Sequence, residues 1–299
     1  MFESQKLKII RKNLYQHVDV LANQIGERNL HNKGSLQKTV DYIFEQMNRS
    51  SLDVNQLNFS FNGQSFSNIV AEKKGQEYED QIIIIGAHYD TVEDSPGADD
   101  NATGIAGLLE MIRLFSDFDN KRTYRFVAFA LEEPPFYGTS QMGSHVYAES
   151  CKQRNDNVLF MTSLEMLGYF LNKKNTQRYP EPDLARKHPN RGNFISVVGD
   201  PESKPLLKKV SNNISKFTTV PIELFIAHRG TPGANLSDHA SFWKFGFRAI
   251  MITDTAFYRN PHYHKPDDTI DTIHFKKFSN LVYGLTKAYK EFDDVDFNF

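Results

Sequence analysis

Acidic and imidazole side chains follow the predicted strands of this sequence at the points where the strands end. Five of them stand at the ends of separate strands or in the loops after them: His88, Asp99, Glu133, Glu165 and His264. Such a mixed set of nitrogen and oxygen ligands suits zinc and is also open to manganese or cobalt. One zinc ion needs only three or four ligands. Five, with a carboxylate available to bridge, predict two ions about 3.5–4 Å apart.

Two adjacent glutamates, Glu132 and Glu133, stand where a predicted strand runs into Pro134 and Pro135. Adjacent side chains of a regular strand point to opposite faces, but the prolines impose a turn at which both can approach one centre. We therefore expect a division of labour. Glu133 would bind a metal ion, whereas Glu132 would take a proton from the attacking water and later give it to the leaving amine.

A run of four isoleucines at 82–85 predicts a fully buried strand that leads to His88 and Asp90. The period of two puts these two side chains on the same side, so Asp90 is expected to orient the imidazole of His88. Beyond Asp99 and Asp100, apolar residues over 102–115 recur at helical spacing. The two aspartates therefore lie at the mouth of a strand–loop–helix unit, where α/β proteins bind ligands.

The elements that must position these residues alternate along the chain. Helices are expected over 8–24, 35–48, 102–115, 138–149 and 203–217. A short helix that bears Phe242 and Trp243 is expected after Ser237-Asp238-His239, and a closing helix with Phe278, Leu281, Val282 and Leu285 on one face. Strands are expected over 53–62, 67–73, 82–90, 123–130, 158–164, 194–198, 222–226 and 248–253. This alternation predicts an α/β sandwich around a mostly parallel sheet. We interpret residues 1–299 as one domain, with N-terminal helices in 1–50 and a polar loop insertion at about 171–192.

Composition limits the function classes. The 299 residues carry 35 Lys and Arg against 37 Asp and Glu, so no basic stripe argues for nucleic acid. The single cysteine, Cys151, excludes an internal disulfide and a cysteine-based zinc cluster. No apolar stretch suits a signal peptide or a membrane span. We expect a cytoplasmic location, with a secreted or periplasmic one open if a leader was removed, and the oligomeric state stays open.

Six motifs between residues 86 and 269 carry a resemblance to a known family: GAHYDT, GADDNATG, LEEPPFYGTSQMGS, SLEMLGY, SDHASFW and YHKPDDT. In this order they resemble peptidase family M28, the two-zinc aminopeptidases. The resemblance implies a three-layer αβα sandwich around a mixed, mostly parallel sheet. It implies that His88, Asp99 and Glu165 hold one zinc, and that Asp99, Glu133 and His264 hold the other. It further implies Glu132 as general base and acid, Asp90 as orienting residue and Tyr263 as a donor to the oxyanion.

The expected function is that of a metal-dependent exopeptidase acting on a peptide or small amide, most simply an aminopeptidase that releases N-terminal residues. One alternative is a glutaminyl-cyclase-like acyltransferase with a single zinc, although such relatives lack the first histidine ligand and His88 is present. Another is a non-catalytic binding module on the same fold. Glu165 departs from the aspartate common at its position, which leaves the preference for a free amine open.

Several nearby residues are given structural roles. His239 and Asp238 are expected to bond or cap locally within their turn, and His262 is set aside in favour of His264 as ligand. For Arg229, a position in a solvated loop and a contact with the substrate are equally open interpretations. Aromatic residues at Phe136, Tyr169 and Phe257 are expected to favour apolar substrate side chains.

Overall fold

A computed structural model describes residues 4–228, 230–295 and 297 of the chain. Within these residues, eight strands form one sheet in the order β1-β2-β4-β3-β5-β8-β6-β7. The strands are β1 (Asp53–Phe61), β2 (Gln64–Lys73), β3 (Tyr78–His88), β4 (Arg122–Phe129), β5 (Asn157–Glu165), β6 (Ile195–Gly199), β7 (Ile222–Ile226) and β8 (Ala249–Thr253). The pairs β4-β3, β3-β5, β5-β8 and β6-β7 are parallel. The pairs β1-β2, β2-β4 and β8-β6 are antiparallel.

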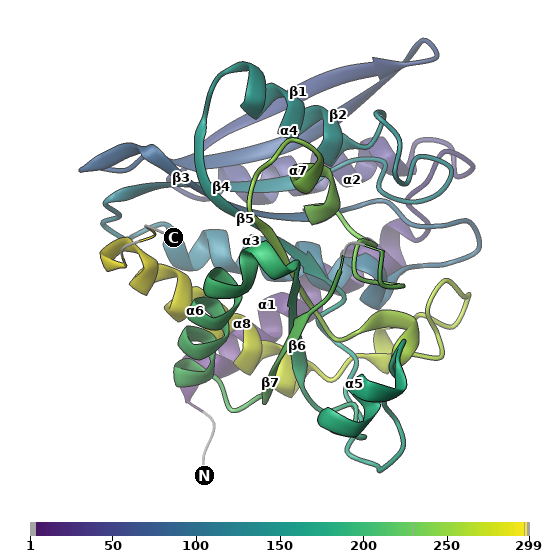
Figure 1. The fold of residues 1–299 in the computed structure, drawn as a ribbon. Helices are drawn as coiled ribbons and strands as arrows, with labels where there is room; N and C mark the ends of the chain where they lie inside the picture. Colours follow the sequence, from purple (N-terminus) through teal and green to yellow (C-terminus); the bar gives the residue numbers. More distant parts are fainter. Residues whose placement is uncertain (1–3, 229, 296, 298–299) are drawn as a thin grey trace.

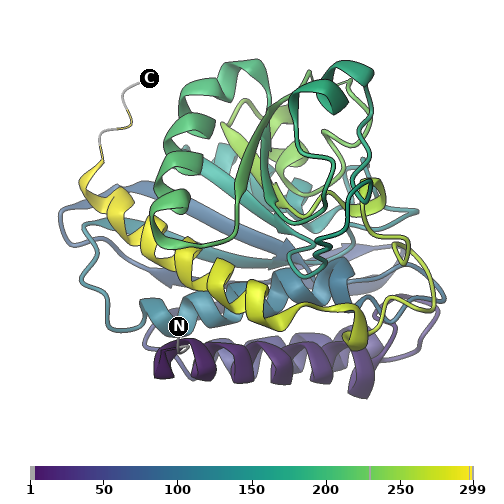
Figure 2. The same cartoon turned by 90° about the horizontal axis from the view of Figure 1, so that it is seen from below.

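Helices cover both faces of this sheet (Figures 1 and 2). One face carries α1 (Gln5–Val18), α2 (Ser35–Asn48), α3 (Gly104–Phe115), α6 (Lys204–Phe217) and α8 (Phe275–Glu291), which contact one another, and the other carries α4 (Gly143–Gln153) and α7 (His239–Lys244). The helix α5 (Pro182–Lys187) lies in the loop between β5 and β6. The predicted three-layer sandwich around a mixed sheet is therefore confirmed.

The central strands form because their side chains are apolar on both faces. All residues of β3 from 82 to 88 are buried, and the side chains of Ile83, Ile84, Ile85 and Ala87 are 0% exposed. Such a strand is stable only with a layer of helices on each side. The larger core packs α1, α2, α3, α6 and α8 on one face, and a second cluster around Phe129, Phe242 and Trp243 fills the other. This burial fixes the strand ends that carry the polar residues.

Element boundaries differ from the predictions in a few places. The helix expected over 138–149 begins only at Gly143, because residues 136–142 form turns that follow Pro134 and Pro135. The first helix changes at Val18 into a π-helical segment, Asp19–Ile25. Residues 171–192 are mostly irregular, as expected, but include α5. That residues 1–299 form one domain stays a prediction.

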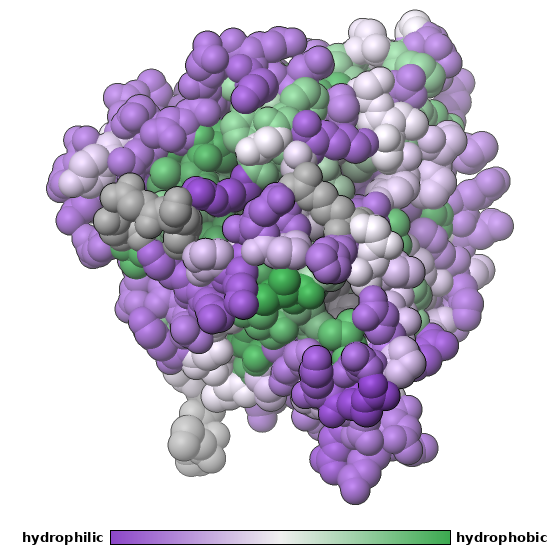
Figure 3. All heavy atoms as spheres, viewed as in Figure 1, coloured by the Kyte–Doolittle hydropathy of each residue, from purple (hydrophilic) through white to green (hydrophobic). Residues whose placement is uncertain are grey.

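Figure 3 shows a largely hydrophilic face with a hydrophobic patch in its lower centre, around the position of β6 and β7 in Figure 1. The strand β7 is at the sheet edge, and four of its five residues are only half-buried. Among the described residues, no helix has the length and apolar character needed to cross a membrane.

Candidate metal centre

The candidate site lies at the carboxyl ends of four neighbouring strands, β4, β3, β5 and β8, which run parallel. These ends therefore lie together at one end of the sheet, which is where open α/β sheets bind ligands. His88 is the last residue of β3, and Glu165 is the last residue of β5. Glu133 follows β4, and His264 lies in the loop after β8. The fold thus brings together four of the five predicted ligands.

The fifth position belongs to Asp100, which lies between the two imidazoles. Its Oδ1 is 3.5 Å from His88 Nε2, and its Oδ2 is 3.2 Å from His264 Nε2. Glu165 Oε2 is 3.3 Å from His88 Nε2, and Glu133 Oε2 is 3.3 Å from His264 Nε2. Two groups of three ligand atoms result, each within 4.8 Å: His88, Asp100 and Glu165, and Asp100, Glu133 and His264. Asp100 is the carboxylate that the two groups share.

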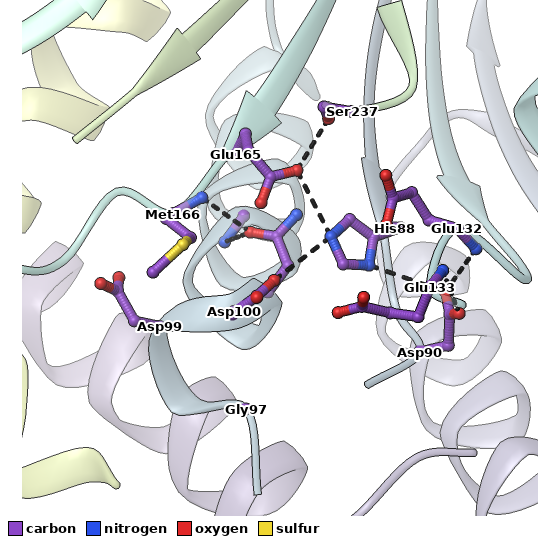
Figure 4. A network of polar contacts seen from close by, with 12 residues as sticks. His88, Asp90, Gly97, Asp99, Asp100, Glu132, Glu133, Glu165, Met166 and Ser237 are labelled. Atoms are coloured by element: carbon purple, nitrogen blue, oxygen red, sulfur yellow. Dashed lines mark hydrogen bonds and ion pairs between the residues drawn. The ribbon is translucent and has the colours of Figure 1, made fainter. Parts of the chain in front are cut away.

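The prediction that Asp99 is this shared carboxylate is wrong by one residue. Asp99 Oδ1 accepts from the amide of Gly168 at 2.9 Å, and its Oδ2 accepts from the side-chain amide of Asn260 at 3.0 Å. Figure 4 shows Asp99 apart from the group that Asp100 and His88 form. The backbone dihedrals of Asp100 and Asn101 are not helical. Successive side chains in this irregular segment therefore point in directions that no sequence period gives.

Asp90 fixes the turn that carries the paired glutamates. Its Oδ1 accepts from the amide of Glu132 and its Oδ2 from the amide of Glu133, both at 3.0 Å. Its Oδ1 lies 3.6 Å from His88 Nδ1, so the expected contact with the imidazole is present but longer than a hydrogen bond. Glu132, Glu133 and His88 form a third group of ligand atoms within 4.8 Å (Figure 4). Glu132 thus lies beside the two groups that share Asp100.

The electrostatics of the site are those of crowded, buried acids. Burial raises the pKa of Glu133 to about 7, and the charge of Asp100 adds to this effect. Burial likewise raises the pKa of Glu132 well above its usual value. For Asp100, burial acts in the same direction, but His264 and His88 outweigh it and hold the pKa below its usual range. Burial lowers the pKa of His264, yet Asp100 and Glu133 outweigh it and raise the value to about 10.

These features fit a pair of divalent cations. Carboxylates that share a buried site resist ionisation together, and a cation between them removes that cost. His264 Nε2 makes no hydrogen bond within the described residues, although two carboxylate oxygens lie near it. The side chain of His264 is 31% exposed and that of His88 only 1%. The site therefore opens to solvent on the His264 side.

Two supporting residues were not found by sequence reasoning. Ser237 donates its hydroxyl to Glu165 Oε2 at 2.7 Å, and Asp268 accepts from the amides of Asp99 and Asp100, each at 3.0 Å. Both lie in motifs noted in the sequence, SDHASFW and YHKPDDT. Their partners are more than 70 positions away along the chain. Without an alignment, no local pattern links them to those partners.

The residues given structural roles belong to none of the three groups of ligand atoms. His262 bonds to Asp267 at 2.7 Å, and His239 Nε2 donates to the carbonyl of Ala234 at 2.9 Å, as expected for a structural histidine. Asp238 occupies the N-cap position of α7, but its side chain makes no capping bond, so of its two expected roles, cap or local support, only local support stays a prediction. Arg229 lies outside the described residues.

A mainly apolar hollow adjoins the cluster beside Glu165 and Tyr263. Its lining includes Val198, Phe225, Ala227, Met251 and Phe257, with residues 177–180 from the loop after β5. Of the three aromatic residues expected to shape the substrate pocket, this lining includes only Phe257. Phe136 lines a second hollow next to Glu133 and packs edge-to-face on Phe61.

Comparison with known proteins identifies the relationship. The fold is that of BSAP, a zinc aminopeptidase from Bacillus subtilis, with a TM-score of 0.75 at 17% identity over 94% of each chain. A glutaminyl cyclase from Bacteroides thetaiotaomicron gives 0.68 at 17% identity over 93% of this chain and 96% of the other. At these identities the likeness shows the fold alone.

Sequence comparison is more specific. The model of peptidase family M28 matches residues 68–283. The chain is 36% identical to the Escherichia coli K12 protein YfbL over 282 residues. The aligned part is 92% of this chain and 86% of YfbL. The chain spans about half the length of the fungal relatives named probable zinc metalloprotease or probable leucine aminopeptidase. The chain therefore belongs to peptidase family M28, as its motifs indicate, and is a metallopeptidase by family.

Proposed function

We propose that this protein is an aminopeptidase that uses two zinc ions to release N-terminal residues from peptides. The observation that carries the proposal is the pair of ligand groups that share Asp100. His88, Asp100 and Glu165 would hold one ion, and Asp100, Glu133 and His264 would hold the other. When bound, the ions would polarise the scissile carbonyl and lower the pKa of the attacking water. Manganese or cobalt would suit the same ligands.

Glu132 is the general base and acid in this proposal. Its position is supported by Asp90, which accepts from the backbone amides of Glu132 and Glu133 and so holds the backbone from which both side chains extend. Glu132 accepts a proton from the attacking water and gives it to the leaving amine. Burial raises the pKa of this carboxyl, which favours a group that both accepts and returns a proton near neutral pH.

Tyr263 is proposed to donate to the oxygen that becomes negatively charged. Its ring stacks on His264, with 3.8 Å between the ring centroids, and it lines the apolar hollow beside Glu165. Burial raises the pKa of its hydroxyl, with Asp100 and Glu133 acting in the same direction. The hydroxyl therefore remains protonated at neutral pH and able to donate.

The apolar hollow supports a preference for N-terminal residues with apolar side chains. Glu165 lies at the junction of this hollow and the metal-ligand groups. A substrate whose side chain fills the hollow would present its free amine to the carboxylates of Glu165 and Glu132. This arrangement favours a free amino terminus over an acylated one, because a buried cationic amine is stabilised only by opposite charge.

The experiment compares zinc-loaded wild type with Glu132→Gln on leucine p-nitroanilide and on its N-acetylated form. We expect the wild type to hydrolyse only the free-amine substrate, and E132Q to lose roughly 10²–10⁴-fold in kcat while it binds the same amount of zinc. Equal turnover by E132Q would refute the proposed mechanism, and equal hydrolysis of the acetylated substrate would refute aminopeptidase specificity.

The likeness to a glutaminyl cyclase favours one alternative, a single-zinc acyltransferase. The presence of His88 within a ligand group argues against it, because the glutaminyl-cyclase-like relatives lack this histidine ligand. Incubation of the zinc-loaded protein with a glutaminyl peptide separates the two: cyclisation with loss of ammonia supports the acyltransferase, and release of free glutamine supports the peptidase. A zinc-loaded protein that binds peptides and does neither would be a binding module.

A further inference from the structure

A buried arginine from the N-terminal segment holds the loop that leads to Asp100. Arg28 is 0% exposed, and its guanidinium donates to five backbone carbonyls. Nε donates to Tyr89 O at 2.8 Å, and Nη2 donates to Gly97 O at 2.8 Å. Nη1 lies within hydrogen-bond distance of the carbonyls of Leu21, Gly26 and Pro96, at 3.1, 3.0 and 2.7 Å.

The backbone of Arg28 adds two bonds to the same loop. Its amide donates to Thr91 Oγ1 at 3.0 Å, and its carbonyl accepts from the amide of Thr91 at 3.0 Å. The contacted residues, Tyr89, Thr91, Pro96 and Gly97, all lie between His88 and Asp100. Gly97 has a φ of 57°, and a Cβ there would lie 2.9 Å from Arg28 Nη2. The loop is therefore packed directly against the guanidinium.

The other side of this loop is held by Asp268, whose carboxylate accepts from the amides of Asp99 and Asp100. The amide of Ala98 also donates to the carbonyl of Asp268, at 3.0 Å. Residues 97–100 thus lie between a cation and a carboxylate from distant parts of the chain. These bonds leave little freedom to the backbone that orients Asp100.

The partners that the structure gives the guanidinium of Arg28 are all backbone carbonyls. Among the described residues, no carboxylate forms an ion pair with its guanidinium, although burying an unpaired charge is costly. Burial lowers the pKa of Arg28 to about 10, against the charges of Asp268, Asp90, Asp100 and Glu133. The group therefore stays charged at neutral pH. Its charge therefore interacts with several buried carboxylates of the site and is not paired with a single one.

We propose that Arg28 is a positioning residue of the metal site: it fixes the 89–97 loop through the carbonyls of Tyr89, Pro96 and Gly97 and thereby orients Asp100, the carboxylate that the two ligand groups share. This inference rests on the metal site of the proposed function. Arg28 lies outside the residues that match the family model, 68–283, so the N-terminal segment contributes to the site. A planar guanidinium supplies its donors in a fixed fork, which a lysine ammonium does not.

The test measures zinc affinity, by competition with a chelator of known affinity, for wild type, Arg28→Met, Arg28→Lys and Arg122→Met. Arg122 is a matched control, since it is also buried and donates to the carbonyls of Phe292 and Asp293, but at the amino end of β4, away from the site. We expect R28M to weaken binding of at least one ion by roughly 10–100-fold, as for other groups that orient ligands. R28K should show a smaller loss, and R122M should lower Tm without changing zinc affinity.

Equal affinity in R28M and wild type would overturn the inference, and so would an equal loss of affinity in R122M, which would indicate general destabilisation. If R28M does not fold, R28K and Thr91→Val decide the matter, because each removes part of the same contacts, and unchanged affinity in both would contradict the proposal. A wild type that binds no zinc would instead refute the metal site itself.

Discussion

The carboxylate of Asp90 accepts a hydrogen bond from the backbone amide of Glu132 at 3.0 Å, and its second oxygen holds the amide of Glu133 in the same way. Asp90, which follows β3, thus fixes the turn that follows the neighbouring strand β4. The contact with His88 Nδ1, at 3.6 Å, is the weaker of its interactions. Asp90 therefore supports the paired glutamates as much as it supports the histidine.

Asp90→Ala should show whether this support is needed for metal binding. Without the carboxylate, the two amides lose their acceptor and the glutamates lose their fixed orientation. We expect zinc affinity to fall by roughly 10–100-fold and activity to fall with it. Equilibrium dialysis with metal analysis measures the change, and Asp80→Asn, an exposed acid in the same strand, serves as the control. Wild-type zinc affinity in D90A would contradict this role.

Asp100 and Asp99 should differ sharply when each is changed to asparagine. Burial and the nearby Asp254 raise the pKa of Asp99 well above its usual value. The oxygens of Asp99 accept from Gly168 and Asn260 and belong to neither ligand group, so its substitution leaves all the ligand atoms in place. Asp100 is shared by both ligand groups. We expect D100N to lose both ions and D99N to keep two, as measured by metal content after dialysis. Loss of both ions in D99N, with retention in D100N, would restore the original assignment.

The apolar hollow should set the size of the N-terminal side chain. Ala227 is half-buried in its lining, so Ala227→Leu would fill part of the space without entering the core. We expect kcat/KM for leucine and phenylalanine substrates to fall at least about tenfold relative to alanine, since a single methylene is worth about 1–3 kcal/mol in an apolar pocket. Ala240→Leu, in a half-buried position outside the hollow, is the control. If A227L kept the substrate preference of the wild type, the N-terminal side chain of the substrate would not bind in this hollow.

His239 should make the protein sensitive to acid. Burial lowers its pKa from 6.5 to about 4, while its Nε2 donates to Ala234 and its Nδ1 lacks a partner among the described residues. The unfolded chain therefore binds a proton between pH 6.5 and 4 that the folded chain does not. The contribution of His239 to stability is complete above pH 6.5 and is lost as the pH falls towards 4.

The magnitude of this loss is about 3 kcal/mol of unfolding free energy for a shift of this size. Urea unfolding of metal-free wild type and His239→Gln at pH 7.5 and 4.5 measures it. The difference between the two pH values should be smaller in H239Q by that amount. An identical pH dependence in both proteins would show that His239 does not titrate in this way.

Periodicity in the sequence predicted the parts of the site that regular structure positions. His88 and Glu165 end strands whose apolar runs are unmistakable, and Glu133 and His264 follow such strands in distinctive motifs. The choice between Asp99 and Asp100 could not be predicted in this way, because their loop has no period and its backbone is set by distant groups. Arg28 and Asp268 supply those constraints. Contacts of this kind depend on the tertiary fold and leave no local signal.

The most direct test of the account is an anomalous-difference map from crystals of the zinc-loaded protein, recorded at the zinc edge. We predict two peaks about 3.5–4 Å apart, with Asp100 between them, His88 and Glu165 on one, and Glu133 and His264 on the other. A single peak, or a pair bridged by any residue other than Asp100, would contradict it.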